Sequence, residues 1–242
     1  MADFNEFDGQ GSTPSQDSGS IISHAFEMYK GVLLYAVLAF LIYMALSWVI
    51  QLLSGFNSET MIEEMKNGYE SINYWSIPGM KTYSSLTGLL SIFISPLYVG
   101  MIFILNRYNN RQPVTFADLF IGYRQNLGNI LLYSIVASIL ISIAAMLCFL
   151  PVLFVFPLLL LGYPILLFEN ASVGDALSKA YNIAKNNYGV FFLVSLVGFL
   201  LSLSGIILCF VGIVLTAFFF TAIMYSTYVA YCGKPRPLID QV

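Results

Sequence analysis

FENASVGDALSKAYNIAKNNYG, residues 168–189, is a polar stretch that lies between two long charge-free runs, 125–168 and 186–233. Two shorter charge-free runs cover residues 31–58 and 82–106. A helix that rises ~1.5 Å per residue needs about 20 apolar residues to cross the hydrocarbon layer of a bilayer. Each long run is therefore long enough for two spans with a tight turn between them, and each shorter run is long enough for one.

These runs predict an all-α, polytopic membrane protein with six transmembrane helices in three hairpins. The composition agrees, since 58% of the residues are hydrophobic and only 10% are charged, against about 25% charged in a soluble domain. A bilayer requires backbone polar groups to be satisfied internally, which favours helices, and the runs lack the alternation of a β-barrel. We expect spans at about 31–53, 85–106, 128–149, 152–168, 189–208 and 212–232.

The Lys and Arg residues predict that both termini are cytoplasmic. In that orientation only Lys66 and Lys81, in an extracytoplasmic loop over residues 54–84, lie outside. This bias satisfies the positive-inside rule. Residues 1–18 are acidic and rich in Gly, Ser and Gln, so we expect a disordered cytoplasmic tail without a cleavable signal peptide. The cations expected inside are Lys30, Arg107, Arg111, Arg124, Lys179, Lys185, Lys234 and Arg236.

An internal repeat organises the second half of the chain. Segments that start at Thr115 and Ser172 each begin with a Ser/Thr-x-x-Asp helix start, followed by a Gly and then by a Cys near an expected hairpin turn. A fainter copy starts near residue 20, so we expect a cytoplasmic amphipathic helix before each of three hairpins. The paired positions are Thr115 with Ser172, Asp118 with Asp175, Gly128 with Gly189, Cys148 with Cys209, and Pro151 with Gly212.

The polar stretch itself is predicted to be a helix over residues 173–188 that lies in the cytoplasmic interface. One face carries apolar residues at helical spacing, and the opposite face carries Lys and Asn, a pattern typical of a helix at the headgroup boundary. The apolar face consists of Val173, Ala176, Leu177, Ala180, Tyr181, Ala184 and Tyr188. The candidate interfacial lipid contacts are Arg124, Lys179, Tyr181, Lys185 and Tyr188.

Three segments carry a family resemblance: FADLFIGYRQNLG (116–128), ALSKAYNIAKNNYG (176–189) and YVAYCGKPRP (228–237). They resemble a broad family of uncharacterised bacterial six-helix inner-membrane proteins, similar to the membrane domain fused to some glycerophosphodiester phosphodiesterases. The resemblance covers roughly residues 20–236 and implies the same fold and an inner-membrane location. That family has no agreed catalytic residues to transfer.

No catalytic residue, cofactor or metal is expected. The chain has one His and three Cys without a CxxC pair, and the predicted span cores have no ionisable residue, which disfavours a proton pathway. We therefore expect a non-enzymatic protein that binds or organises lipids or protein partners, at its cytoplasmic face or at the 54–84 loop, and that does not bind nucleic acid. A small-solute transporter or channel built on the repeats is the alternative.

Small residues leave two further points open. Ser195, Gly198, Ser202 and Gly205 form a ridge that favours close helix packing, with a polar solute path as the alternative. Cys148 and Cys209 either fill turns as small apolar residues or form a disulfide between the repeats.

Overall fold

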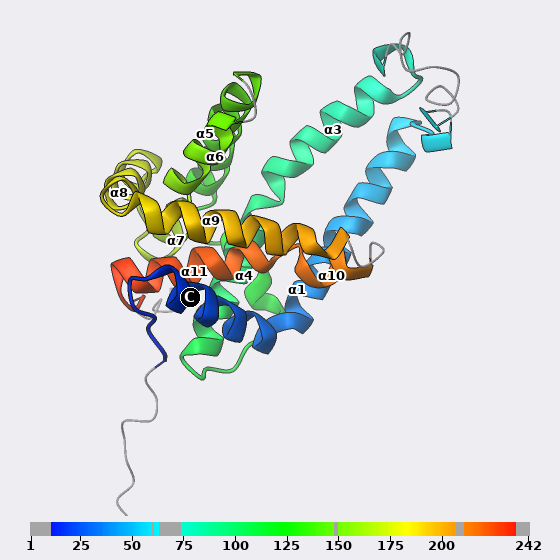
Figure 1. The fold of residues 1–242 in the computed structure, drawn as a ribbon. Helices are drawn as coiled ribbons and strands as arrows, with labels where there is room; N and C mark the ends of the chain where they lie inside the picture. The colour runs from blue at the N-terminus through cyan, green and yellow to red at the C-terminus, as the bar shows by residue number, and fades with distance from the viewer. Residues whose placement is uncertain (1–10, 60, 63–73, 148–149, 207–210, 236–242) are drawn as a thin grey trace, which may run out of the picture. The chain divides into compact units, whose positions relative to one another are not determined.

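The computed structural model describes residues 11–59, 61–62, 74–147, 150–206 and 211–235, and every regular element among them is a helix. Figure 1 shows their order along the chain. This confirms the all-α prediction. Six helical segments are long and apolar enough to cross a membrane, as predicted: Ser18–Ser54, Met80–Asn109, Leu127–Met146, Pro151–Phe168, Tyr188–Ile206 and Gly212–Cys232. The chain forms two compact units, one of Met1–Ala39 with Ser95–Val242 and the other of Phe40–Ile94.

The first helix, α1 (Ser18–Ser54), is continuous over 37 residues. The sequence predicts a separate amphipathic segment before the first span, but no break separates the two. Asp17 begins the helix, because its carboxylate accepts the backbone N–H of Ser20 at 2.9 Å. The Ser15 hydroxyl, and then that backbone N–H, lower the pKa of the Asp17 carboxyl.

Three of the later spans are interrupted helices. The second consists of α3 (Met80–Phe93) and α4 (Ser95–Asn109), the fourth of α6 (Leu150–Leu158) and α7 (Gly162–Phe168), and the sixth of α10 (Val211–Thr216) and α11 (Phe219–Cys232). Pro96, Pro157 and Pro164 lie at or beside the first two breaks. Proline has no N–H to donate to the preceding turn, which explains interruptions at these points. The third and fifth spans are α5 (Leu127–Met146) and α9 (Tyr188–Leu203), the latter extended by η4 (Ser204–Ile206).

Within the larger unit, α4 lies at the centre of the packing, against α5, α7 and α11 and against the short helix η3 (Phe116–Tyr123). The approach to η3 is very close: a Cβ on Gly100 would lie 1.9 Å from the Leu119 carbonyl oxygen. Arg107 then donates two hydrogen bonds of 2.9 Å to the Asp118 carboxylate. The sequence predicts an amphipathic helix before the second hairpin, whereas η3 is a 3₁₀ helix fixed to α4 by these contacts.

Residues 11–17 make defined contacts with the same unit, whereas the sequence predicts disorder to residue 18. Ser12 donates from its backbone N–H to the Asn109 side chain at 2.8 Å, and Asn109 donates to the Ser12 carbonyl oxygen and to the Tyr225 hydroxyl, both at 2.9 Å. The buried His24 ring lies 2.8 Å from the Ser226 hydroxyl and 3.1 Å from that of Ser12. This polar cluster joins the N-terminal segment to α1, α4 and α11. The rest of the predicted tail, 1–10, lies outside the described residues.

The smaller unit contains the second half of α1, the short helix η2 (Tyr74–Ser76) and α3. Phe56 and Tyr83 stack at 4.7 Å between ring centroids, and Gly79 takes a left-handed φ of 77° just before α3. Residues 60 and 63–73 of the predicted 54–84 loop lie outside the described residues, so the predicted partner surface there stays a prediction. Cys148 and Cys209 also lie outside the described residues, so the two alternatives for these cysteines stay predictions.

Candidate functional site

The polar stretch forms the helix α8 (Val173–Asn186), which starts and ends close to where the sequence predicts. Ser172 begins it, because its hydroxyl accepts the backbone N–H of Asp175 at 3.2 Å and donates to the Asp175 carboxylate at 2.7 Å. Asp175 in the first turn and Lys185 in the last complement the helix dipole. The cap and these charges favour a helix in a segment that contains Asn182 and Asn186.

One face of α8 packs against the protein. Ala176, Ala180 and Ala184 have no exposed surface, and α8 contacts α5, α6, α7 and α9 (Figure 1). The sequence assigns these alanines to a membrane-facing surface, together with Tyr181, which is 46% exposed. Alanine side chains are small enough to let two helices approach closely. The apolar face is therefore divided between a packed row of alanines and an exposed tyrosine.

An ion pair holds α8 to the end of α7. Lys179 lies 2.7 Å from both oxygens of the Glu169 carboxylate, and Tyr228 of α11 donates to the same carboxylate at 3.0 Å. The side chains of Lys179 and Glu169 are 43% and 29% exposed. Lys179 is one of the predicted lipid contacts, but its charge is already paired within the protein.

The turn before α5 is joined to the start of α8. Asn126 adopts a left-handed backbone conformation with φ 51°, and its side-chain amide donates to the carbonyl oxygens of Leu166 and Ala171, both at 3.0 Å. Arg124 is exposed two residues earlier. Periodicity gave no signal for these Asn126 contacts, because they join segments 40 and 45 residues apart.

The remaining predicted residues differ in their surroundings. Tyr188 is held against α6, since its hydroxyl donates to the Phe154 carbonyl oxygen at 3.3 Å and its ring stacks on that of Phe154. The Lys185 ammonium group lies 5.8 Å from the centre of the Tyr181 ring, and both residues are exposed. Arg124, Tyr181 and Lys185 are thus the candidate contacts that present their side chains outward.

Comparisons with protein families, with curated proteins and with solved structures gave no match. Among the residues that the structure describes, no three His, Cys, Asp or Glu side chains come together as a group that could hold a metal ion.

Proposed function

We propose that this chain is a non-enzymatic multi-pass membrane protein that binds anionic lipid headgroups through the exposed side chains of Arg124, Tyr181 and Lys185. One observation carries the proposal: next to its row of buried alanines, α8 exposes Tyr181 and Lys185, with the lysine ammonium group 5.8 Å from the centre of the tyrosine ring. α8 follows the end of α7 directly and precedes the start of α9, so it lies at a boundary where apolar spans end. A helix in that position is adjacent to the headgroup layer.

The chemistry of the three side chains suits an anionic headgroup. A Lys or Arg near an anionic membrane surface contributes about 1 kcal/mol, and Tyr is enriched at membrane interfaces because its ring is amphipathic. Lys179 is not part of the proposed surface, because Glu169 neutralises it. The proposal includes the predicted orientation, with these side chains and both termini on the cytoplasmic side of an inner membrane. It also includes membership of the bacterial inner-membrane family that the sequence resembles.

A small-solute transporter or channel is the second candidate, and the interrupted helices favour it. The fourth and sixth spans are the second helices of the two predicted repeats, and both are broken. Broken helices at matching positions are typical of solute sites in transporters. Here, however, tyrosine hydroxyls from other helices donate to carbonyl oxygens near the breaks, Tyr133 to Leu159 at 2.7 Å and Tyr29 to Leu215 at 2.9 Å. Protein groups occupy these carbonyls, which supports the lipid-binding proposal over the transporter.

Native mass spectrometry of the detergent-purified protein tests the proposal. We expect the wild type to retain phosphatidylglycerol in preference to phosphatidylcholine, and Lys185→Gln and Arg124→Gln each to lower that retention about fivefold, the factor that corresponds to 1 kcal/mol. Lys81→Gln removes an exposed cation from the smaller unit and is the matched control. Equal loss in all three variants, or no preference in the wild type, would contradict a headgroup site at α8.

A further inference from the structure

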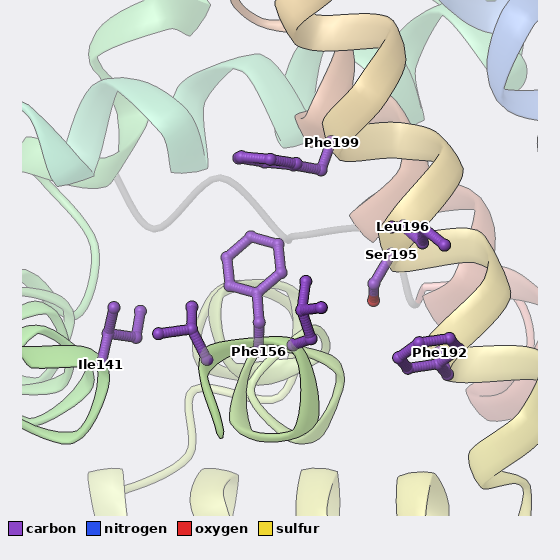
Figure 2. Close-up of a pocket in the computed structure, with 8 residues that line it drawn as sticks. Ile141, Phe156, Phe192, Ser195, Leu196 and Phe199 are labelled. Atoms are coloured by element: carbon purple, nitrogen blue, oxygen red, sulfur yellow. The ribbon is translucent and has the colours of Figure 1, made fainter. Parts of the chain in front are cut away.

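An apolar crevice lies between α5, α6 and α9, apart from the proposed headgroup surface (Figure 2). This partly open crevice has a volume of about 200 Å³, compared with about 150 Å³ for an apolar cavity that accepts benzene. The volume is enough for part of a hydrocarbon chain but not for a whole lipid. Its walls include Ile141 of α5, Phe156 of α6, and Phe192, Ser195, Leu196 and Phe199 of α9.

Ser195 supplies the one polar side chain among the described residues that line this crevice. It is only 2% exposed, and its hydroxyl has no hydrogen-bond partner among the described residues. Figure 2 shows the hydroxyl oxygen directed toward the space that Phe156 and Phe192 line. An unpaired buried hydroxyl costs free energy, so a partner for it is expected.

The other hydroxyl on the same face of α9 behaves differently. Ser202 donates to the Gly198 carbonyl oxygen one turn earlier at 2.9 Å, as serines in apolar helices commonly do. Ser195 makes no such bond to the preceding turn. Its hydroxyl therefore remains available to an occupant of the crevice.

Water is a poor occupant of this site. A buried water molecule typically makes about three hydrogen bonds, whereas the crevice offers it one hydroxyl among carbon side chains. Ser195 also lies seven residues after the start of α9, about 10 Å along the helix axis. This position is inside an apolar span, where the surrounding solvent is hydrocarbon.

We propose that this crevice binds the hydrocarbon chain of a lipid that carries one uncharged oxygen, a hydroxyl or an ester carbonyl, which pairs with the Ser195 hydroxyl. The apolar walls bind the chain by burying its surface, and the single hydroxyl selects chains that have an oxygen at the matching depth. The inference rests on the proposed lipid-binding function for its class of ligand, but it concerns a separate site without charged residues.

Competitive photo-crosslinking of the full chain in detergent tests this site with uncharged probes. The labelled probe is a fatty alcohol with a diazirine in its chain, and the competitors are oleyl alcohol, methyl oleate and 1-octadecene, which has no oxygen. We expect crosslinks on α6 and α9 peptides and an affinity for oleyl alcohol about fivefold above that for 1-octadecene, the usual contribution of one neutral hydrogen bond. Methyl oleate distinguishes an ester from a hydroxyl, because its carbonyl can only accept the Ser195 proton.

Two variants make the result specific to Ser195. Ser195→Ala should remove the preference for the oxygenated chains while leaving the binding of 1-octadecene unchanged. Ser202→Ala, on the same helix, should keep the preference, because its hydroxyl is already paired. Crosslinks spread over all spans, equal competition by oleyl alcohol, methyl oleate and 1-octadecene, or an unchanged preference in Ser195→Ala would each overturn the proposal.

The two proposals fail separately. Loss of phosphatidylglycerol selectivity in Lys185→Gln with an intact preference for oleyl alcohol supports both sites. If the headgroup test fails while the binding of the uncharged probes still depends on Ser195, the proposal for the α8 surface is refuted and the proposal for the crevice stands.

Discussion

Gly100→Ala is expected to destabilise the protein even though alanine favours helices. Gly100 lies within α4, where replacing Gly by Ala in a helix interior usually gains about 1 kcal/mol. At this position, however, the new Cβ would lie 1.9 Å from the carbonyl oxygen of Leu119 and 2.5 Å from its carbonyl carbon. Both atoms belong to the backbone of η3, so no side-chain rotation can relieve the contact.

The size of the effect follows from this geometry. Cβ atoms essentially never approach another atom within 3.0 Å, so η3 would have to retreat from α4 by about 1 Å. A shift of that size would also strain the two 2.9 Å bonds between Arg107 and Asp118. Overpacking typically costs 1–3 kcal/mol, and we expect a net loss of about 2 kcal/mol. In a chain of this length that lowers the melting temperature by about 4–8 °C.

Thermal unfolding in detergent, followed by circular dichroism at a fixed scan rate, measures this effect. Gly88→Ala is the matched control, because Gly88 lies inside α3 and a Cβ there would meet nothing within 4 Å. That variant should melt at or slightly above the wild-type temperature. If Gly100→Ala melts at as high a temperature as Gly88→Ala, then η3 does not pack against α4 as closely as described.

Three further variants test other contacts. Tyr133→Phe removes the hydroxyl that donates to a carbonyl at the break between α6 and α7, and should cost about 1 kcal/mol; a melting temperature equal to that of the wild type would mean that the bond is absent. Asn109→Ala removes the side chain that bonds to the Ser12 backbone and to the Tyr225 hydroxyl, so maleimide should label Ser12→Cys faster in that background than in an otherwise unchanged chain; equal rates would mean that the N-terminal segment is not held there. On α8, Asn182→Cys should react much faster than Ala180→Cys, since Ala180 has no exposed surface; similar rates at both positions would contradict the packed face.

The number of apolar spans could be predicted from the sequence because hydropathy depends only on local composition. The breaks were only partly predictable. Pro157 and Pro164 indicate an interruption of the fourth span, but residues 217–218, between α10 and α11, contain no proline or glycine. An interruption without such a residue depends on what packs beside it, here the Tyr29 hydroxyl bonded to Leu215 and the Tyr29 ring packed 5.3 Å from that of Phe219. Contacts between residues so far apart leave no periodic signal.

The candidate surface on α8 also shows what sequence periodicity leaves undetermined. Periodicity groups Ala180 and Tyr181 on one apolar face, but it does not say whether protein or lipid covers that face. The structure separates them: Ala180 is buried where α8 packs against its neighbouring helices, as small residues allow, whereas Tyr181 is 46% exposed. The Ser172 cap was predictable, since it depends on residues three positions apart. The Asn126 bonds to Leu166 and Ala171 were not.

Pairing within the protein decides which cations can meet an anionic headgroup. The positive-inside rule weighs every Lys and Arg equally, but Arg107 is paired with Asp118, and Lys179 is paired with Glu169. Each pair joins segments at least ten residues apart and holds a short helix, η3 or α8, to a neighbouring one. These two charges therefore hold η3 and α8 in place, and we do not expect them to bind a headgroup. Arg124 and Lys185 are exposed, and the expected lipid selectivity should depend on these two and change little when Arg107 or Lys179 is neutralised in a form that still folds.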